Sequence, residues 1–324
     1  MEPSLIKKKL LRNIRLFSLC LLYLIFFIPW LNAQQLEWQT ESDKVPVVYF
    51  TSDISPRGLL KVYKALGQEI SGKVGIKVSF GGPGEQYLDP ELLTELVEET
   101  DGVLIDSNGL AGNRWTSALN YALADVHGFS DVGKVQILDE SGDMDLPVEG
   151  GYLLDYVRTG SHFAEYTTLI AVHRFKLHYI EAMGGNIKNI SLCLASKSGK
   201  NLIHSGGKDP NRYHATDPDV LARSFADAAK AAVDYNPNWA FINVLDSFEP
   251  DDTCRGTSNI GDIGIIASSD VVALDQCALD FTLSCSGADQ QTKQRWLEYH
   301  QTNVLEYAEA LGIGSRRYRL VNID

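Results

Sequence analysis

Short apolar runs rich in Val, Ile and Leu alternate with longer amphipathic segments along most of this chain of 324 residues. Apolar runs between turn residues are typical of buried strands, and apolar residues at helical spacing are typical of helices. This alternation predicts an α/β fold, a mostly parallel sheet flanked by helices, with two closely associated α/β halves. At least four strands between residues 47 and 138 should share one sheet. The predicted strands are 47–51, 73–79, 103–106, 135–138, 169–178, 239–245, 263–267 and 318–321.

Three of the predicted helices begin with a capping residue followed by proline: Ser55-Pro56, Asp89-Pro90 and Asp217-Pro218. The side-chain oxygen of the first residue can accept a hydrogen bond from the first helical turn, and proline is favoured at the first helical position. We place the helices at 56–70, 90–99, 113–127, 218–235, 270–285 and 289–311.

The first 33 residues form a targeting segment in this interpretation. The basic stretch KKKLLRNIR precedes an apolar run at 16–31, and Ala33-Gln34 is a candidate cleavage junction. An uncleaved membrane anchor is the alternative. We expect a protein exported to the periplasm or cell envelope, which meets the membrane only through this segment. The remaining chain should form one α/β domain at 45–285, with 286–324 packed on it as a helix and a short strand.

The chain carries a formal charge of -13, and its pI is about 5.0. Because the targeting segment is basic, the remainder is more acidic than the whole. Such a body would be repelled by phosphate backbones, so we do not expect nucleic acid as a partner. A small-molecule ligand is expected instead.

The stretch 169–200 organises the candidate chemistry. If 169–178 is one extended strand, Arg174, Lys176 and His178 lie on one face, with Lys176 and His178 about 7 Å apart. A glycine turn follows at 184–185 and leads to Lys188 and Asn189. These groups either form a solvated basic stripe on a surface strand or bind charge and transfer protons to a ligand.

Polar residues also lie near the ends of two earlier predicted strands. Lys77 lies inside the strand at 73–79, while Asp106 and Asn108 come at the end of the strand at 103–106. Ligands of open α/β sheets bind outside the carboxyl ends of the strands, so we treat these three as candidate cofactor-binding residues. The nearby GGPGE sequence lacks the lysine of a phosphate-binding loop and the spacing of a dinucleotide-binding loop, so it is interpreted as a turn.

Asp275 falls inside the apolar arc of the helix at 270–285. A buried carboxylate is costly without partners, so Asp275 should meet a cation, a metal or several backbone donors. It either takes part in the chemistry or braces a loop or helix start.

Several segments resemble those of the domain-of-unknown-function family 362, in consistent order over about residues 45–283. They are VGIKVSFGGPG, LIDSNGLAGNRW, HGF at 127–129, FKLH, GGNIKN, ASKSGK, His204-Ser205 and DIGIIASSDVVALDQ. Many members of that family carry an inserted ferredoxin-type module, which implies iron–sulfur redox chemistry.

This chain departs from the family pattern in two places. No cysteine lies between His204 and Asp217, so a built-in ferredoxin-type cluster is excluded. A Cys-Asp-Cys element common in the family stands here as Asp252-Thr253-Cys254. His204, Asp252 and Cys254 therefore become candidate ligands for a transition metal, iron or zinc.

These observations predict a metal-dependent or redox-associated enzyme that acts on a small acidic or carbonyl-bearing molecule, with a separate redox partner as an option. The candidate catalytic residues are Lys176, His178, Lys188, Asn189 and Asp275. A non-catalytic ligand-binding protein of the cell envelope is the alternative. No G-x-S-x-G sequence is present, so a serine hydrolase is not expected. At least three of six residues should lie within about 10 Å of a common point, the span of a small-molecule pocket. The six are Lys176, His178, His204, Cys254, Asp262 and Asp275.

Overall fold

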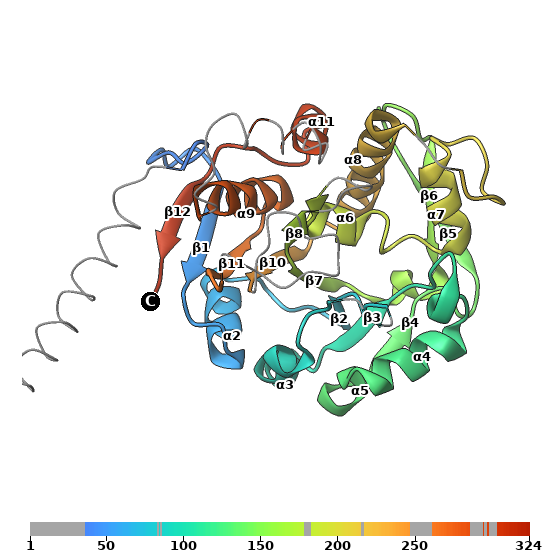
Figure 1. Cartoon of the computed structure of the whole chain (residues 1–324), viewed down its shortest axis with the longest axis horizontal. Coiled ribbons are helices and arrows are strands. Elements are labelled where there is room, and N and C mark those ends of the chain that lie inside the picture. The colour runs from blue at the N-terminus through green and yellow to red at the C-terminus, as the bar shows by residue number, and fades with distance from the viewer. Residues whose placement is uncertain are drawn as a thin grey trace, which may run out of the picture. The chain divides into compact units, whose positions relative to one another are not determined.

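An eight-stranded sheet runs through the unit Trp38–Asp324, as Figure 1 shows. The computed structural model describes residues 36–82, 84, 86–177, 183–214, 217–246, 261–285, 294, 297 and 303–324. The predicted targeting segment and the candidate residues His178, Asp252 and Cys254 lie outside these ranges.

The sheet is mostly parallel, as predicted. Strand β11 is antiparallel to both of its neighbours, β1 and β10, and every other neighbouring pair is parallel. The four predicted strands between residues 47 and 138 are β1, β2, β3 and β4, and all belong to this sheet. Its order is β12 (Arg319–Asn322), β1 (Val47–Thr51), β11 (Gly264–Ser268), β10 (Trp239–Leu245), β7 (Thr168–Arg174), β2 (Val74–Lys77), β3 (Val103–Asp106) and β4 (Val135–Ile137).

The predicted capping residues begin their helices. Ser55 accepts a hydrogen bond from the Gly58 N–H, Asp89 from Glu91 and Asp217 from Asp219. The α-helices are α2 (Pro56–Ala65), α3 (Thr94–Thr100), α4 (Ser117–Val126), α5 (Phe129–Val132), α6 (Asn186–Ile190), α7 (Lys197–His204), α8 (Pro218–Tyr235), α9 (Val271–Cys285) and α11 (Val304–Ala310). Short 3₁₀ helices are η1 (Pro90–Leu93), η2 (Gly112–Arg114) and η3 (Ser161–Glu165).

Helices cover both faces of the sheet (Figure 1). On one face, Ile76, Ile170 and Ile242 join a buried apolar cluster with α2 and α3, which contribute Leu59 and Leu96. On the other face lie α6, α8 and α9. There the ring of Phe50 on β1 stacks on Phe281 of α9, with 5.3 Å between ring centroids. This second face also carries the polar side chains described below.

The predicted single strand at 169–178 is wrong. Strand β7 ends at Arg174, and the chain then forms β8 (Lys176–Leu177), which pairs with β9 (Met183–Gly184) in a separate two-stranded sheet. The local pairing of Lys176 with Gly184 replaces pairing with β10, whose last partner on β7 is Arg174. Arg174 and Lys176 therefore do not share one strand face.

Other differences come from local hydrogen bonding. The predicted helix at 113–127 is split into η2 and α4, because Thr116 caps α4 by accepting from the Leu119 N–H. His204, predicted in a loop, is the last residue of α7. A hairpin of β5 (Asp143–Pro147) and β6 (Tyr156–Gly160) was not predicted, although Met144 and Leu146 alternate with polar residues in β5. Within the ranges described above, no helix has the length and apolar character needed to cross a membrane.

Candidate functional site

Four polar side chains lie in mostly apolar strands, close to the strands' carboxyl ends. Lys77 ends β2, Asp106 ends β3, His173 is the penultimate residue of β7, and Asn243 lies opposite His173 on β10. All four are buried. Because neighbouring parallel strands end at the same edge of the sheet, these groups gather where open α/β sheets bind ligands.

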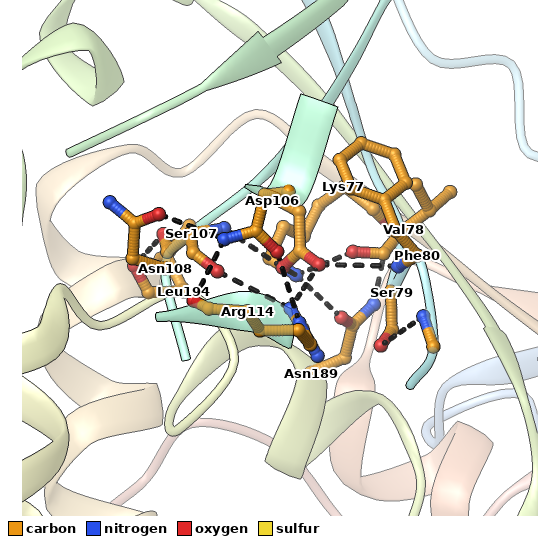
Figure 2. Close-up of polar contacts among 12 residues, drawn as sticks. Lys77, Val78, Ser79, Phe80, Asp106, Ser107, Asn108, Arg114, Asn189 and Leu194 are labelled. Carbon is orange, nitrogen blue, oxygen red and sulfur yellow. Dashed lines mark hydrogen bonds and ion pairs between the residues drawn. The ribbon is translucent and has the colours of Figure 1, made fainter. Parts of the chain in front are cut away.

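An ion pair joins β2 to β3, as Figure 2 shows. The Lys77 Nζ donates to Asp106 Oδ1 at 3.0 Å, and both side chains have no exposed surface. The other carboxylate oxygen of Asp106 accepts from an Arg114 Nη2 and from the Phe80 N–H. Burial raises the pKa of Asp106, but the charges of Arg114 and Lys77 outweigh it, so the pKa is lowered overall.

Helix α6 connects this ion pair to the rest of the sheet. The Lys77 Nζ also donates to Asn189 Oδ1 at 3.0 Å, and Asn189 Nδ2 donates back to the Lys77 carbonyl oxygen. One turn earlier, Asn186 Nδ2 donates to Asn243 Oδ1 at 2.9 Å. We call these residues with Asp106 and Asp275 the strand-end network. Its hydrogen bonds fix α6 across the ends of β2 and β10.

Asp275 is fully buried, as its place in the apolar arc predicts, and its partners are hydrogen-bond donors. It accepts from the N–H groups of Asn186 and Ile187 at 2.9 and 2.8 Å, and from Asn243 Nδ2 at 2.7 Å. Burial raises the pKa of this carboxyl to about 6, against the opposing effect of these hydrogen bonds. Asp275 thus braces the start of α6. Its predicted part in the chemistry stays a prediction.

His173 differs from its neighbours because its Nε2 has no hydrogen-bond partner among the residues that the structure describes. Burial lowers its pKa well below the ordinary value, and four positive charges lower it further: Lys176, Lys188, Lys77 and Arg174. The imidazole is therefore neutral at neutral pH, inside a cluster of cations.

A small cavity of about 30 Å³ lies beside His173. We call it the His173 cavity. It is large enough for one or two waters or for one end of a ligand. Among the residues that line this cavity, Gln86 also has a buried polar atom, Oε1, without a partner in the described part of the chain. The cavity is lined by Ser79, Gly81, Gln86, Tyr87, Leu88, His173, Arg174 and Lys176.

Cationic side chains outnumber carboxylates around the His173 cavity in the described part of the chain. Lys77 is paired with Asp106, and Arg174 Nε is paired with Asp246 Oδ1 at 2.8 Å. Within the described ranges, no carboxylate lies within ion-pair distance of Lys176. A protein of net charge -13 has thus concentrated cations at one strand edge.

Helix α7 adds one more buried cation near Asp106. The Lys200 Nζ donates to the Ala195 carbonyl oxygen, and burial lowers the pKa of this amine to about 8. Asn108, a predicted cofactor-binding residue, braces its loop: its N–H donates to Asp139 Oδ1, and its Oδ1 accepts from Asn120.

The structure unites some of the predicted site residues and separates others. Lys77, Asp106, Asn189 and Asp275 belong to the strand-end network. Lys176 lines the His173 cavity, and the charge of Lys188 acts on His173. His204 is buried at the end of α7, where its ring lies 4.8 Å from that of Tyr213, centroid to centroid.

The proposed metal ligands are represented in the structure only by His204. Among the residues described, no three His, Cys, Asp or Glu side chains are grouped so as to hold a metal ion. The metal site therefore stays a prediction.

Sequence reasoning missed His173, Arg114, Asn186, Asn243 and Lys200. His173 and Asn243 did carry a signal, because each interrupts a strongly apolar strand near its carboxyl end. Arg114 and Lys200 carried none. Arg114 acts through a hydrogen bond to Asp106, and Lys200 acts on Asp106 through its charge from a distant part of the sequence.

Comparisons with known proteins place the chain in a family without a described activity. No curated protein matches it. The family model described as a domain of unknown function, DUF362, matches residues 74–280.

Two solved structures are similar in part. The lactate racemase apoprotein from Thermoanaerobacterium thermosaccharolyticum is 13% identical, with a TM-score of 0.45 over 71% of this chain and 56% of that one. A protein from Thermotoga maritima is 9% identical, with a TM-score of 0.38 over 80% and 59%. The chain spans little more than half the length of each, and neither likeness bears on function.

Proposed function

We propose that this chain, which belongs to the DUF362 family, binds a small acidic molecule at the His173 cavity and exchanges a proton with it through His173. The observation that carries the proposal is His173 itself, a buried neutral imidazole with an unpartnered Nε2 among four cations. Such a group is costly to bury without a ligand to meet it.

The charge around the cavity favours a carboxylate or phosphate group as the ligand's anionic end. Lys77 and Arg174 have carboxylate partners, whereas Lys176 lines the cavity without one in the described ranges. In a partly buried site, an attraction between opposite charges is screened less than in water. The surrounding acidic protein would repel the same ligand elsewhere, so binding would be confined to this edge.

His173 can act as a base only when the ligand is present. The four cations that hold its pKa down would be offset by a bound anion, which favours protonation of the imidazole. A proton taken from a carbon next to a carbonyl group would leave negative charge on oxygen, and Lys176 is placed to stabilise it. Without a proton step, the same site describes the ligand-binding alternative.

Binding is tested with pyruvate, which carries both an acid and a carbonyl group, and with inorganic phosphate, by isothermal titration at pH 7. We expect the purified protein to bind at least one of them. Lys176→Ala should weaken binding at least tenfold, about 1.4 kcal/mol, because it removes a cation that lines the cavity. Lys61→Ala, an exposed lysine on α2 across the sheet, is the matched control and should bind as the unchanged protein does.

The proton step has a separate measurement. In D₂O, the bound pyruvate methyl group should exchange its protons for deuterium, and His173→Gln should abolish the exchange while it keeps most of the affinity. Binding without exchange would favour the ligand-binding protein. No binding of either probe would contradict the proposed site.

We further propose that the protein acts outside the cytoplasm and that His204, Asp252 and Cys254 hold iron or zinc. The first rests on the basic and apolar character of the first 33 residues, and the second on the residue types alone. Elemental analysis of the purified protein should find about one transition metal per chain. Cys254→Ser should lower that content, whereas Cys285→Ser should not.

A further inference from the structure

A second group of reactive side chains lies away from the strand-end network. Ser141 follows β4 in an exposed turn, and His162 and Glu165 lie on η3. Ser141 Oγ is 2.9 Å from His162 Nε2, and His162 Nδ1 is 2.5 Å from Glu165 Oε1. These contacts link a hydroxyl to an imidazole and the imidazole to a carboxylate. This is the order of groups that activates a nucleophilic serine.

Backbone hydrogen bonds hold the serine and the histidine together. The Ser161 N–H donates to the Gly142 carbonyl oxygen at 2.8 Å, and the His162 N–H donates to the Leu138 carbonyl oxygen at 3.2 Å. The start of η3 is therefore fixed on the turn that bears Ser141. The contact between the Ser141 and His162 side chains follows from this backbone pairing. It does not depend on the conformations of two long side chains.

The short hydrogen bond to Glu165 favours the His162 tautomer that activation needs. Glu165 also accepts from the Lys73 Nζ at 2.6 Å, and the hydrogen bonds from His162 and Lys73 lower the pKa of its carboxyl. An ionised Glu165 accepts a hydrogen bond from a proton-bearing Nδ1, which leaves the lone pair of Nε2 directed at Ser141. Glu140 Oε1, at 3.6 Å from Nε2, would stabilise the imidazolium once it forms.

A groove of about 580 Å³ lies at the amino ends of β2, β3 and β4. Ser141, His162 and Glu165 are not part of its lining, but Glu140, which contacts His162, and Lys73, which contacts Glu165, are. The lining mixes Lys, Asp and Glu with Tyr121 and Gln136, which suits a small polar molecule of low net charge. Gly142, beside Ser141, has open space on the side where a Cβ would lie, so approach to the serine is not blocked there.

We infer that Ser141, His162 and Glu165 form an ester-cleaving site that serves the groove, separate from the His173 cavity. The Ser141 oxygen forms a bond to the ester carbonyl carbon as its proton passes to His162 Nε2. The tetrahedral adduct then breaks its bond to the alcohol oxygen, which leaves with the proton from His162. Water, activated in the same way, releases the acid and restores the serine, so the net reaction is ester plus water to acid plus alcohol.

The sequence does not reveal this arrangement, because it lacks the G-x-S-x-G elbow and because Ser141 and His162 are brought together by the β5–β6 hairpin between them. Only the fold shows the three groups in line.

The test is reaction of the full chain with diisopropyl fluorophosphate, followed by mass spectrometry of the peptides. We expect the phosphoryl adduct on Ser141, with loss of fluoride. His162→Gln should slow labelling at least 100-fold, the usual contribution of a positioned general base, and Glu165→Gln at least tenfold. Hydrolysis of p-nitrophenyl acetate should fall in parallel in both variants and in Ser141→Ala.

Ser198 provides the matched control. Its Oγ donates to Asp143 Oδ2 at 2.5 Å. Ser198 thus contacts a carboxylate, and it contacts no histidine among the residues that the structure describes. It should remain unlabelled, and Ser198→Ala should react as the unchanged protein does. Absence of the adduct from Ser141, or an unchanged labelling rate in His162→Gln, would overturn the inference. Thermal denaturation of each variant distinguishes a lost fold from lost chemistry, since all three side chains are at least partly exposed.

Discussion

Asp106→Ala is expected to lower the free energy of unfolding by about 3–5 kcal/mol, because it leaves a buried charge without its partner. Lys77 is fully buried and its ammonium group donates to Asp106 at 3.0 Å. The N–H groups of Phe80 and Ser107 also lose their acceptor. Urea denaturation at pH 7 measures the loss.

Two variants make this result specific. Asp145→Ala breaks an ion pair with Arg158 in which the Asp side chain is 48% exposed, and it should cost less than about 1 kcal/mol. The double variant Lys77→Met with Asp106→Leu removes both buried charges and should recover part of the stability lost by Asp106→Ala. A loss below about 1 kcal/mol for Asp106→Ala would show that the pair does not hold the sheet edge.

Asp275→Ala should be the next most damaging change, with a loss of about 3 kcal/mol at pH 7, since three buried donors lose their acceptor. Burial raises the folded-state pKa of Asp275 to about 6 from its ordinary value of 3.8. The folded protein therefore binds this proton more tightly than the unfolded chain does. The resulting stabilisation is fully present below about pH 4 and is lost as the pH rises through about 6.

The difference in stability between the unchanged protein and Asp275→Ala should accordingly narrow from pH 4 to pH 7. Ser284→Ala, on the same helix, serves as control and should lie within about 0.5 kcal/mol of the unchanged protein at each pH. A difference that widened over this interval would mean that the hydrogen bonds to the carboxylate outweigh its burial.

Strands and helices whose pattern was strong were predictable from sequence. The strand 239–245 and the helix 218–235 have the predicted bounds, because an unbroken apolar run and an Asp-Pro start each leave few alternatives. The predicted strand at 169–178 is interrupted at Phe175. The Phe175 N–H still donates to the Val244 carbonyl oxygen, but the next residue, Lys176, pairs with Gly184. Which of two strands a residue pairs with depends on segments that are distant in the sequence. The spacing of apolar residues carries no information about that choice.

The candidate site was predictable only in part for the same reason. Lys77, Asp106 and Asp275 stood out because polar groups in apolar surroundings need partners. The identity of those partners did not follow, since Asn189 lies 112 residues from Lys77 and Asn243 lies 32 residues from Asp275. His173 stayed unnoticed because a single histidine in a strand looks like an ordinary core residue until its neighbours are known.

The place of β1 in the sheet has a consequence for how the chain folds. In β1, Tyr49 pairs with Ala267 of β11 and with Val321 of β12. The strands β7, β2, β3 and β4, which are neighbours of one another, all lie within residues 74–174. These four can pair as soon as that middle part has been synthesised. Strand β1, made before them, must wait for β11 with its apolar residues exposed, and β12 can pair only once β1 is in place. Closing so long a loop slows folding, so we expect β1 to join after these four strands and, until then, to be the segment most open to aggregation.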